Sequence, residues 1–237
     1  MCSLETIIRK SILNSPDDQQ IWYNFITNLT TASTNNSVKY GQINTFESTN
    51  LGKYNQRVGR LWEEFCQGWL ETTGHLGITG CLLLDEIDPE WLEYLGLTSK
   101  DIGIDLIAWT GDPNHDDQVN WFPIQAKFRT NFRKSARQPK VSWSDLSTFF
   151  GLVARTGPPQ GWYKHIIMTN CAGVKWVIPK TTQDLTLAMG SFKKTPRQIW
   201  LKLANFQPNQ LAVPTTQPET IPTTLPELRA ARLKYYS

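Results

Sequence analysis

Three polar residues suited to metal or acid–base chemistry lie in two otherwise apolar stretches of the sequence. Asp105 lies within GIDLIAW, and Gln125 and Lys127 lie within WFPIQAKF. The loop between the two stretches is rich in Gly, Pro, Asn and Asp, which predicts a β-hairpin. If the hairpin folds about the middle of this loop, Asp105 lies opposite Gln125 or Lys127, with about 4.5–5.5 Å between directly opposed Cβ atoms. An acid, an amide and an amine would then meet on two neighbouring strands.

Alternation along a strand assigns each of these side chains to a face of the hairpin. Ile104, Leu106 and Ala108 are predicted on one face, and Asp105 on the other. An Asp inside an apolar strand is unfavourable, because it competes for backbone hydrogen bonds and its charge must be desolvated. The simplest interpretation is a half-exposed face with an Asp–Lys cross-strand pair. The alternative is a metal or catalytic site.

A predicted helix over residues 55–73 supplies a further carboxylate. Glu63 borders its apolar stripe, whereas Glu64 shares a face with Gln67 and Gly68 and is predicted to point toward water. We therefore expect Glu63 to approach the hairpin, with Glu64 as the alternative. The apolar stripe consists of Val58, Trp62, Phe65, Cys66, Trp69 and Leu70.

The segment that follows the second apolar stretch is basic and contains no acidic residue up to Lys140. A basic run is often only a solvated loop, but this one directly follows the strand that carries Gln125 and Lys127. We interpret it as a contact to nucleic-acid phosphates, where each neutralised phosphate releases counterions. Beyond Lys127, its basic residues are Arg129, Arg133, Lys134, Arg137 and Lys140.

These motifs resemble the catalytic core of the PD-(D/E)xK nuclease superfamily. GIDLIA followed by IQAKF is similar to its Mrr-like restriction endonuclease branch, in which Gln often replaces an acidic residue. GRLWEEFCQGWL resembles the first helix of that branch, whose glutamate follows an aromatic residue, here Trp62. The resemblance covers residues 55–169 and says little about the rest of the chain.

The resemblance implies a Mg²⁺-dependent DNA endonuclease of restriction or defence type, with Mn²⁺ as a possible substitute. The metal would be held by Asp105, Gln125, the backbone carbonyl of Ala126 and Glu63, all of which offer the oxygen ligands that Mg²⁺ prefers. Lys127 would orient or help to deprotonate the attacking water. The alternative is a non-catalytic nucleic-acid-binding or assembly module with a nuclease-like fold.

The resemblance also implies partners for the protein. Double-stranded DNA is the expected substrate, and a helicase or translocase domain or subunit is the expected associate, because Mrr-like domains often precede such motors. A homodimer is a further alternative. The recognition sequence and any dependence on methylation are left open by the sequence.

The order of predicted elements indicates the fold class. From residue 55 to 169 it reads helix, strand, strand, strand, helix, strand, similar to the restriction-endonuclease-like αβββαβ core. We therefore predict an α/β fold with a central mixed sheet flanked by helices. Residues 1–50 are predicted as an accessory helical segment, residues 51–205 as the nuclease-like domain, and residues 206–237 as a Pro/Thr/Gln-rich linker and the start of a further element.

Composition excludes several other classes. The 237 residues suffice for a sizeable core, and the net charge of +3 says little about partners. The four cysteines are scattered, without the close pairs of a zinc site. The sequence contains neither a secretory signal nor a long apolar run, so we expect a cytoplasmic protein that does not interact with membranes.

Overall fold

The computed structural model describes residues 3–32, 48–100, 103–113, 119–130, 139–177 and 179–207. The helices are α1 (Leu4–Leu13), α2 (Asp18–Ala32), α3 (Ser48–Thr73), α4 (Pro89–Tyr94), α5 (Ser147–Val153), α6 (Met189–Phe192) and α7 (Arg197–Leu203). The strands are β1 (Gly80–Leu83), β2 (Leu106–Trp109), β3 (Trp121–Lys127), β4 (Val141–Ser142), β5 (His165–Thr169), β6 (Val174–Lys175) and β7 (Asp184–Leu187). Short 3-10 helices span His75–Gly77, Leu84–Glu86 and Ser144–Leu146.

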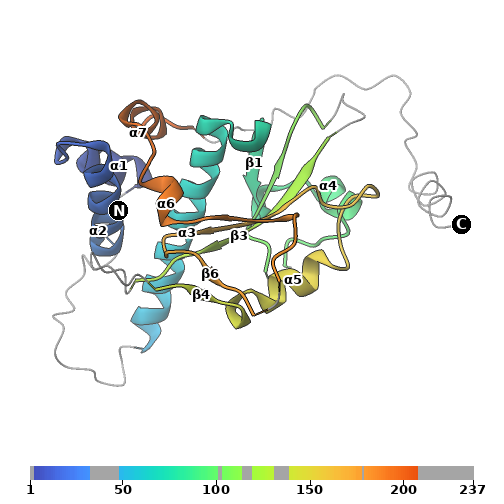
Figure 1. Cartoon of the computed structure of the whole chain (residues 1–237). Helices are drawn as coiled ribbons and strands as arrows, with labels where there is room; N and C mark the ends of the chain where they lie inside the picture. The colour runs from blue at the N-terminus through green and yellow to red at the C-terminus, as the bar shows by residue number, and fades with distance from the viewer. Residues whose placement is uncertain are drawn as a thin grey trace, which may run out of the picture.

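A mixed five-stranded sheet forms the centre of the protein, in the order β1-β2-β3-β5-β7. The first three strands pair antiparallel, whereas β3, β5 and β7 run parallel to one another. β4 and β6 form a separate parallel pair. The predicted α/β class, with a mixed sheet flanked by helices, is confirmed (Figure 1).

Helices cover both faces of this sheet. One face packs against α3, and α1, α2 and α7 pack around α3 on its side away from the sheet (Figure 1). The other face packs against α4 and α5 in a second hydrophobic cluster. Residues from α1 and α2 belong to the same buried cluster as α3, so the N-terminal helices share a core with the sheet.

The β2–β3 hairpin has the predicted register. Leu106 pairs with Ile124, and Trp109 pairs with Trp121. Continuing this register by one position places Asp105 opposite Gln125, as expected from a hairpin that folds about the middle of its loop. The predicted convergence of these two residues is therefore confirmed.

The predicted alternation is wrong at Ile104. Leu106 and Ala108 lie in the cluster beneath α3, but Ile104 lies in the opposite cluster, with Ile107. Ile104 precedes β2, which begins only at Leu106, so the alternation of a regular strand does not extend to it. Gly103, immediately before Ile104, has a φ of 122°. A Cβ at Gly103 would lie 2.9 Å from the backbone nitrogen of Phe149 in α5, so glycine also permits the close approach of the two segments.

The predicted solvent-facing side of α3 is also partly wrong. Gln67 and Gly68 are buried, although Glu64 remains about one-third exposed. Gln67 donates a hydrogen bond to the carbonyl of Cys81 on β1 at 2.9 Å. A Cβ at Gly68 would lie 3.0 Å from the ring of Phe206, because the segment containing α7 packs there. Within the described ranges, no helix is both long enough and apolar enough to cross a membrane.

Candidate functional site

The Asp105 carboxylate occupies the end of the β2–β3 ladder. Its Oδ2 accepts a hydrogen bond from the backbone N–H of Ala126 at 2.7 Å and another from the Gln125 side-chain amide. Gln125 is only 2% exposed, so its amide is held in place by the core. Oδ1 accepts no hydrogen bond from the described residues, so within this part of the chain it has no hydrogen-bond donor.

Lys127 ends β3, two residues beyond Gln125, and pairs in register with Thr169 of β5. It is partly buried. Burial raises the pKa of Asp105, while the hydrogen bonds from Ala126 and Gln125 and the charge of Lys127 act to lower it. The ammonium of Lys127 therefore lies within electrostatic reach of the Asp105 carboxylate.

Glu63 is brought to Asp105 from α3. Burial and the charge of Asp105 raise the pKa of Glu63 to about 7, against the opposing charge of Arg60. Burial also raises the pKa of Glu64, whose charged neighbours are instead Arg60 and Glu86. Of the two candidate glutamates, Glu63 is the one that interacts with Asp105.

Arg60, one helical turn before Glu63, joins α3 to the acidic turn that follows β1. Its guanidinium contacts both carboxylate oxygens of Asp85, at 2.8 and 3.1 Å, and Glu86 at 3.1 Å. A weaker contact of 3.7 Å reaches Glu64. Sequence reasoning did not single out Arg60, although its position one turn before the two glutamates was a signal.

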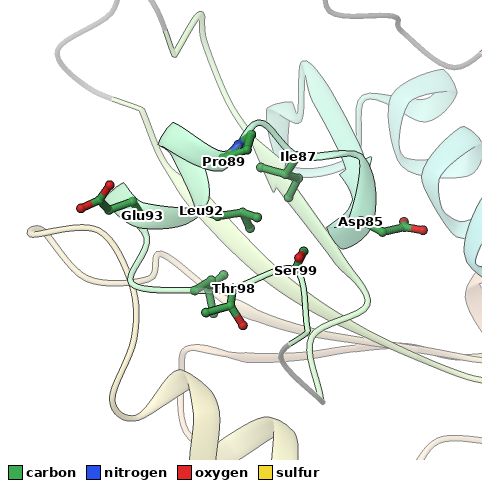
Figure 2. Close-up of a pocket in the computed structure, with 8 residues that line it drawn as sticks. Asp85, Ile87, Pro89, Leu92, Glu93, Thr98 and Ser99 are labelled. Atoms are coloured by element: carbon green, nitrogen blue, oxygen red, sulfur yellow. The ribbon is translucent and has the colours of Figure 1, made fainter.

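A shallow pocket of about 490 Å³ lies next to this turn. Its walls come from the turn, from α4 and from the loop after α4, and Figure 2 shows Asp85 pointing away from Leu92 and Thr98. Asp105, Gln125, Lys127 and Glu63 do not line it. The pocket and the candidate site are therefore separate features.

Arg129 is held just beyond the end of β3. The buried Asn170 accepts from its backbone N–H and donates to its carbonyl, both at 2.8 Å. The Arg129 guanidinium forms an ion pair with Asp145 at 2.6 Å. Hydrogen bonds from Ser142 and Arg129 lower the pKa of Asp145 to about 2. Neither Asn170 nor Asp145 was predicted as a partner of Arg129, because both are distant from it in the sequence.

The structure describes two of the five basic residues predicted beyond Lys127 to contact DNA. Arg129 is partly buried and Lys140 is exposed. Arg133, Lys134 and Arg137 lie outside the described residues. The basic run as a DNA contact therefore stays a prediction.

Comparisons with protein families, curated proteins and solved structures find no match to this chain. In the parts of the chain that the structure describes, no group of three or more His, Cys, Asp and Glu side chains could hold a metal ion. The candidate site has two carboxylates, Asp105 and Glu63. A metal ion there would also need amide or carbonyl oxygens.

Proposed function

We propose that the protein is a Mg²⁺-dependent DNA endonuclease of restriction or defence type, built on a restriction-endonuclease-like αβββαβ core. One observation carries this proposal. Asp105, Gln125 and Lys127 converge at the ends of two paired strands, where Glu63 interacts with Asp105 from the facing helix. Acidic, amide and amine groups in this arrangement suit phosphodiester hydrolysis.

The residues at the site suit a hard cation. The Oδ1 of Asp105 and the carboxylate of Glu63 are oxygen ligands of the kind that Mg²⁺ prefers. Two neighbouring carboxylates disfavour each other's ionisation, and a bound cation would relieve this repulsion. The side-chain oxygen of Gln125 and the carbonyl of Ala126 would complete the protein ligands. When bound, Mg²⁺ or Mn²⁺ would act as a Lewis acid and lower the pKa of a coordinated water.

The remaining residues would act directly on the substrate. Lys127 would orient the attacking water and stabilise negative charge that develops on the phosphate. Arg129 lies two residues after Lys127, and Asn170 holds its backbone in place. Its side chain would bind a neighbouring phosphate of double-stranded DNA. A helicase or translocase domain or subunit would bring DNA to this site, and a second copy of the chain would allow cleavage of both strands.

A non-catalytic nucleic-acid-binding or assembly module is the second candidate. The observation that favours it is the hydrogen bond from Gln125 to Asp105, which engages one carboxylate oxygen within the protein. With Gln in place of an acid, the site also carries two formal negative charges, Asp105 and Glu63. Such a module would bind DNA equally well with and without divalent cations and would not cut it.

Plasmid cleavage separates the two candidates. Supercoiled DNA is incubated with the protein in Mg²⁺, in Mn²⁺ and in EDTA, and nicked and linear products are measured. The nuclease proposal expects products with either metal and none in EDTA, and loss of products in Asp105→Asn. Products from Asp105→Asn at the wild-type rate would show that a contaminating nuclease or another site is responsible.

A further inference from the structure

Three aromatic side chains form a partly exposed surface next to the parallel pair of β4 and β6. Trp143 and Phe150 stack with their ring centroids 4.6 Å apart and their planes at 17°. Trp176 lies 5.6 Å from Trp143 and 5.9 Å from Phe150. All three are partly buried, and Val177 after Trp176 is 73% exposed. We call Trp143, Phe150 and Trp176 the aromatic patch.

Pairing of distant segments creates this patch. Ser142 of β4 pairs with Lys175 of β6, so Trp143 and Trp176 occupy the next positions of the two parallel strands. Phe150 comes from α5. Phe150 and Trp176 also pack against the second hydrophobic cluster, which holds the rings in place before any ligand arrives. A preformed surface loses little conformational entropy on binding.

The two segments that carry the tryptophans of the patch contain basic residues. The segments 139–144 and 171–177 contain Lys140 and Lys175, both exposed, and no acidic residue. Asp145, the next acid along the chain, is paired with Arg129. Aromatic rings next to unopposed cations complement a nucleotide, whose base is flat and apolar and whose phosphate is negative.

We propose that the aromatic patch binds an unpaired base of single-stranded DNA by stacking, with Lys140 and Lys175 contacting the flanking phosphates. The proposal deepens the proposed nuclease function and rests on it for the link to DNA. Asp145, two residues after Trp143, holds Arg129, which lies two residues after Lys127. One ion pair thus connects the patch-bearing segment to the strand that carries the candidate catalytic lysine. The proposal therefore assigns to the patch a single strand that leaves that site.

The test measures binding of two labelled probes in EDTA, so that cleavage does not interfere. One probe is a short oligothymidylate, and the other is an abasic strand of the same length with the same phosphates but no bases. Stacking contributes enough per base that Trp176→Leu is expected to weaken oligothymidylate binding about fivefold or more. The same change should leave binding of the abasic strand unaltered.

Salt dependence separates stacking from charge. Trp176→Leu should lower the affinity for oligothymidylate by the same factor at every salt concentration, because no phosphate contact is lost. Lys175→Gln should instead make the plot of log affinity against log salt shallower by about 0.7 for one contact on a single strand. Trp176→Phe keeps an aromatic ring and should retain most of the affinity.

A matched control is Tyr163→Leu. Tyr163 is 49% exposed and lies beside Lys164, but it is outside the aromatic patch. Its replacement should not change binding of either probe. Equal weakening of both probes by Trp176→Leu, or wild-type binding of oligothymidylate by this folded variant, would overturn the stacking proposal. If the protein does not cleave plasmid, but Trp176→Leu still weakens binding of oligothymidylate and not of the abasic strand, only the nuclease function is rejected.

Discussion

Two aspartates at strand ends of the same sheet have opposite electrostatic surroundings. Asp184 begins β7 and is 8% exposed. Its carboxylate accepts from the backbone N–H and hydroxyl of Thr181, at 2.9 and 2.7 Å, and its other oxygen contacts His165 Nδ1 at 3.1 Å. Burial acts to raise the pKa of Asp184, but these partners outweigh it and the net shift is downward.

Asp105 is also largely enclosed, but its partners do not compensate for its burial. Burial raises the pKa of Asp105, and the hydrogen bonds from Ala126 and Gln125, which meet at one oxygen, do not offset this increase even with the charge of Lys127 nearby. The difference shows that burial of an acid alone does not mark a functional site. An acid whose charge the protein leaves uncompensated is better suited to bind a cation than one with a full set of partners.

The largest expected effect concerns Lys127. Lys127→Ala should reduce cleavage by about 10²–10⁴-fold, the usual contribution of a positioned proton-transfer group. DNA binding should change little, because this lysine acts on the reacting phosphate. Single-turnover cleavage and a binding titration provide the two measurements. Lys164→Ala is the control and should cleave normally, because Lys164 directly precedes β5 whereas Lys127 pairs with Thr169 at the other end of that strand. Equal cleavage by both variants would show that Lys127 is not part of the site.

The two helix glutamates provide the next test. Glu63→Gln should impair Mg²⁺-supported cleavage strongly, with partial recovery at high metal concentration, because one of two carboxylate ligands is lost. Glu64→Gln should have little effect, since its charged neighbours are Arg60 and Glu86 rather than Asp105. The measurement is cleavage rate against Mg²⁺ concentration. If Glu64→Gln is inactive and Glu63→Gln is active, Glu64 rather than Glu63 is the glutamate that acts at the metal site.

The sequence predicted those parts of the site that depend on local patterns. The turn residues of the hairpin loop and the flanking apolar runs were enough to place Asp105 opposite Gln125 or Lys127, and the register selects Gln125. Helical spacing was enough to favour Glu63 over Glu64. Most predicted helices and strands are present in the predicted order, although their ends differ.

Features that depend on distant segments could not be predicted. Gln67 was placed toward solvent because nothing in α3 reveals that β1 provides it with a buried carbonyl partner. Ile104 was placed on the wrong face because the alternation rule assumes regular strand geometry, which begins only at Leu106. β7 was missed because its sequence, DLTL, is short and lacks a continuous apolar run.

The aspartate comparison predicts opposite effects on stability. Asp105→Asn should raise the free energy of unfolding at pH 7, because it removes a charge that burial disfavours, while cleavage is lost. Asp184→Asn should lower it by roughly 1–3 kcal/mol, as expected when hydrogen bonds to a buried charged group are disrupted, with cleavage by the folded protein retained. Urea unfolding at pH 7 provides the comparison. Destabilisation of both variants would mean that Asp105, like Asp184, is structural.

Glu71 provides the smallest and most specific test of the comparison, since it is a half-buried acid and neither aspartate is among the groups that shift its pKa. Its carboxylate accepts from the backbone N–H of Cys81 at 2.9 Å. Burial nevertheless raises its pKa to about 7 from an ordinary value of 4.5. The folded state therefore binds more protons than the unfolded state between these two values, and stability must fall as the pH rises through that range.

Replacing Glu71 with Gln keeps a hydrogen-bond acceptor for Cys81 and removes the titration. Glu71→Gln should match the wild type near pH 4 and exceed its stability at pH 8 by about 1 kcal/mol, after allowance for partial exposure. Glu63 has a pKa raised to the same value, so Glu63→Gln should give a similar gain and the double variant a larger one. Urea unfolding at intervals from pH 4 to pH 8 measures the slope. If Glu71→Gln declines with pH as steeply as the wild type, burial at Glu71 is compensated after all.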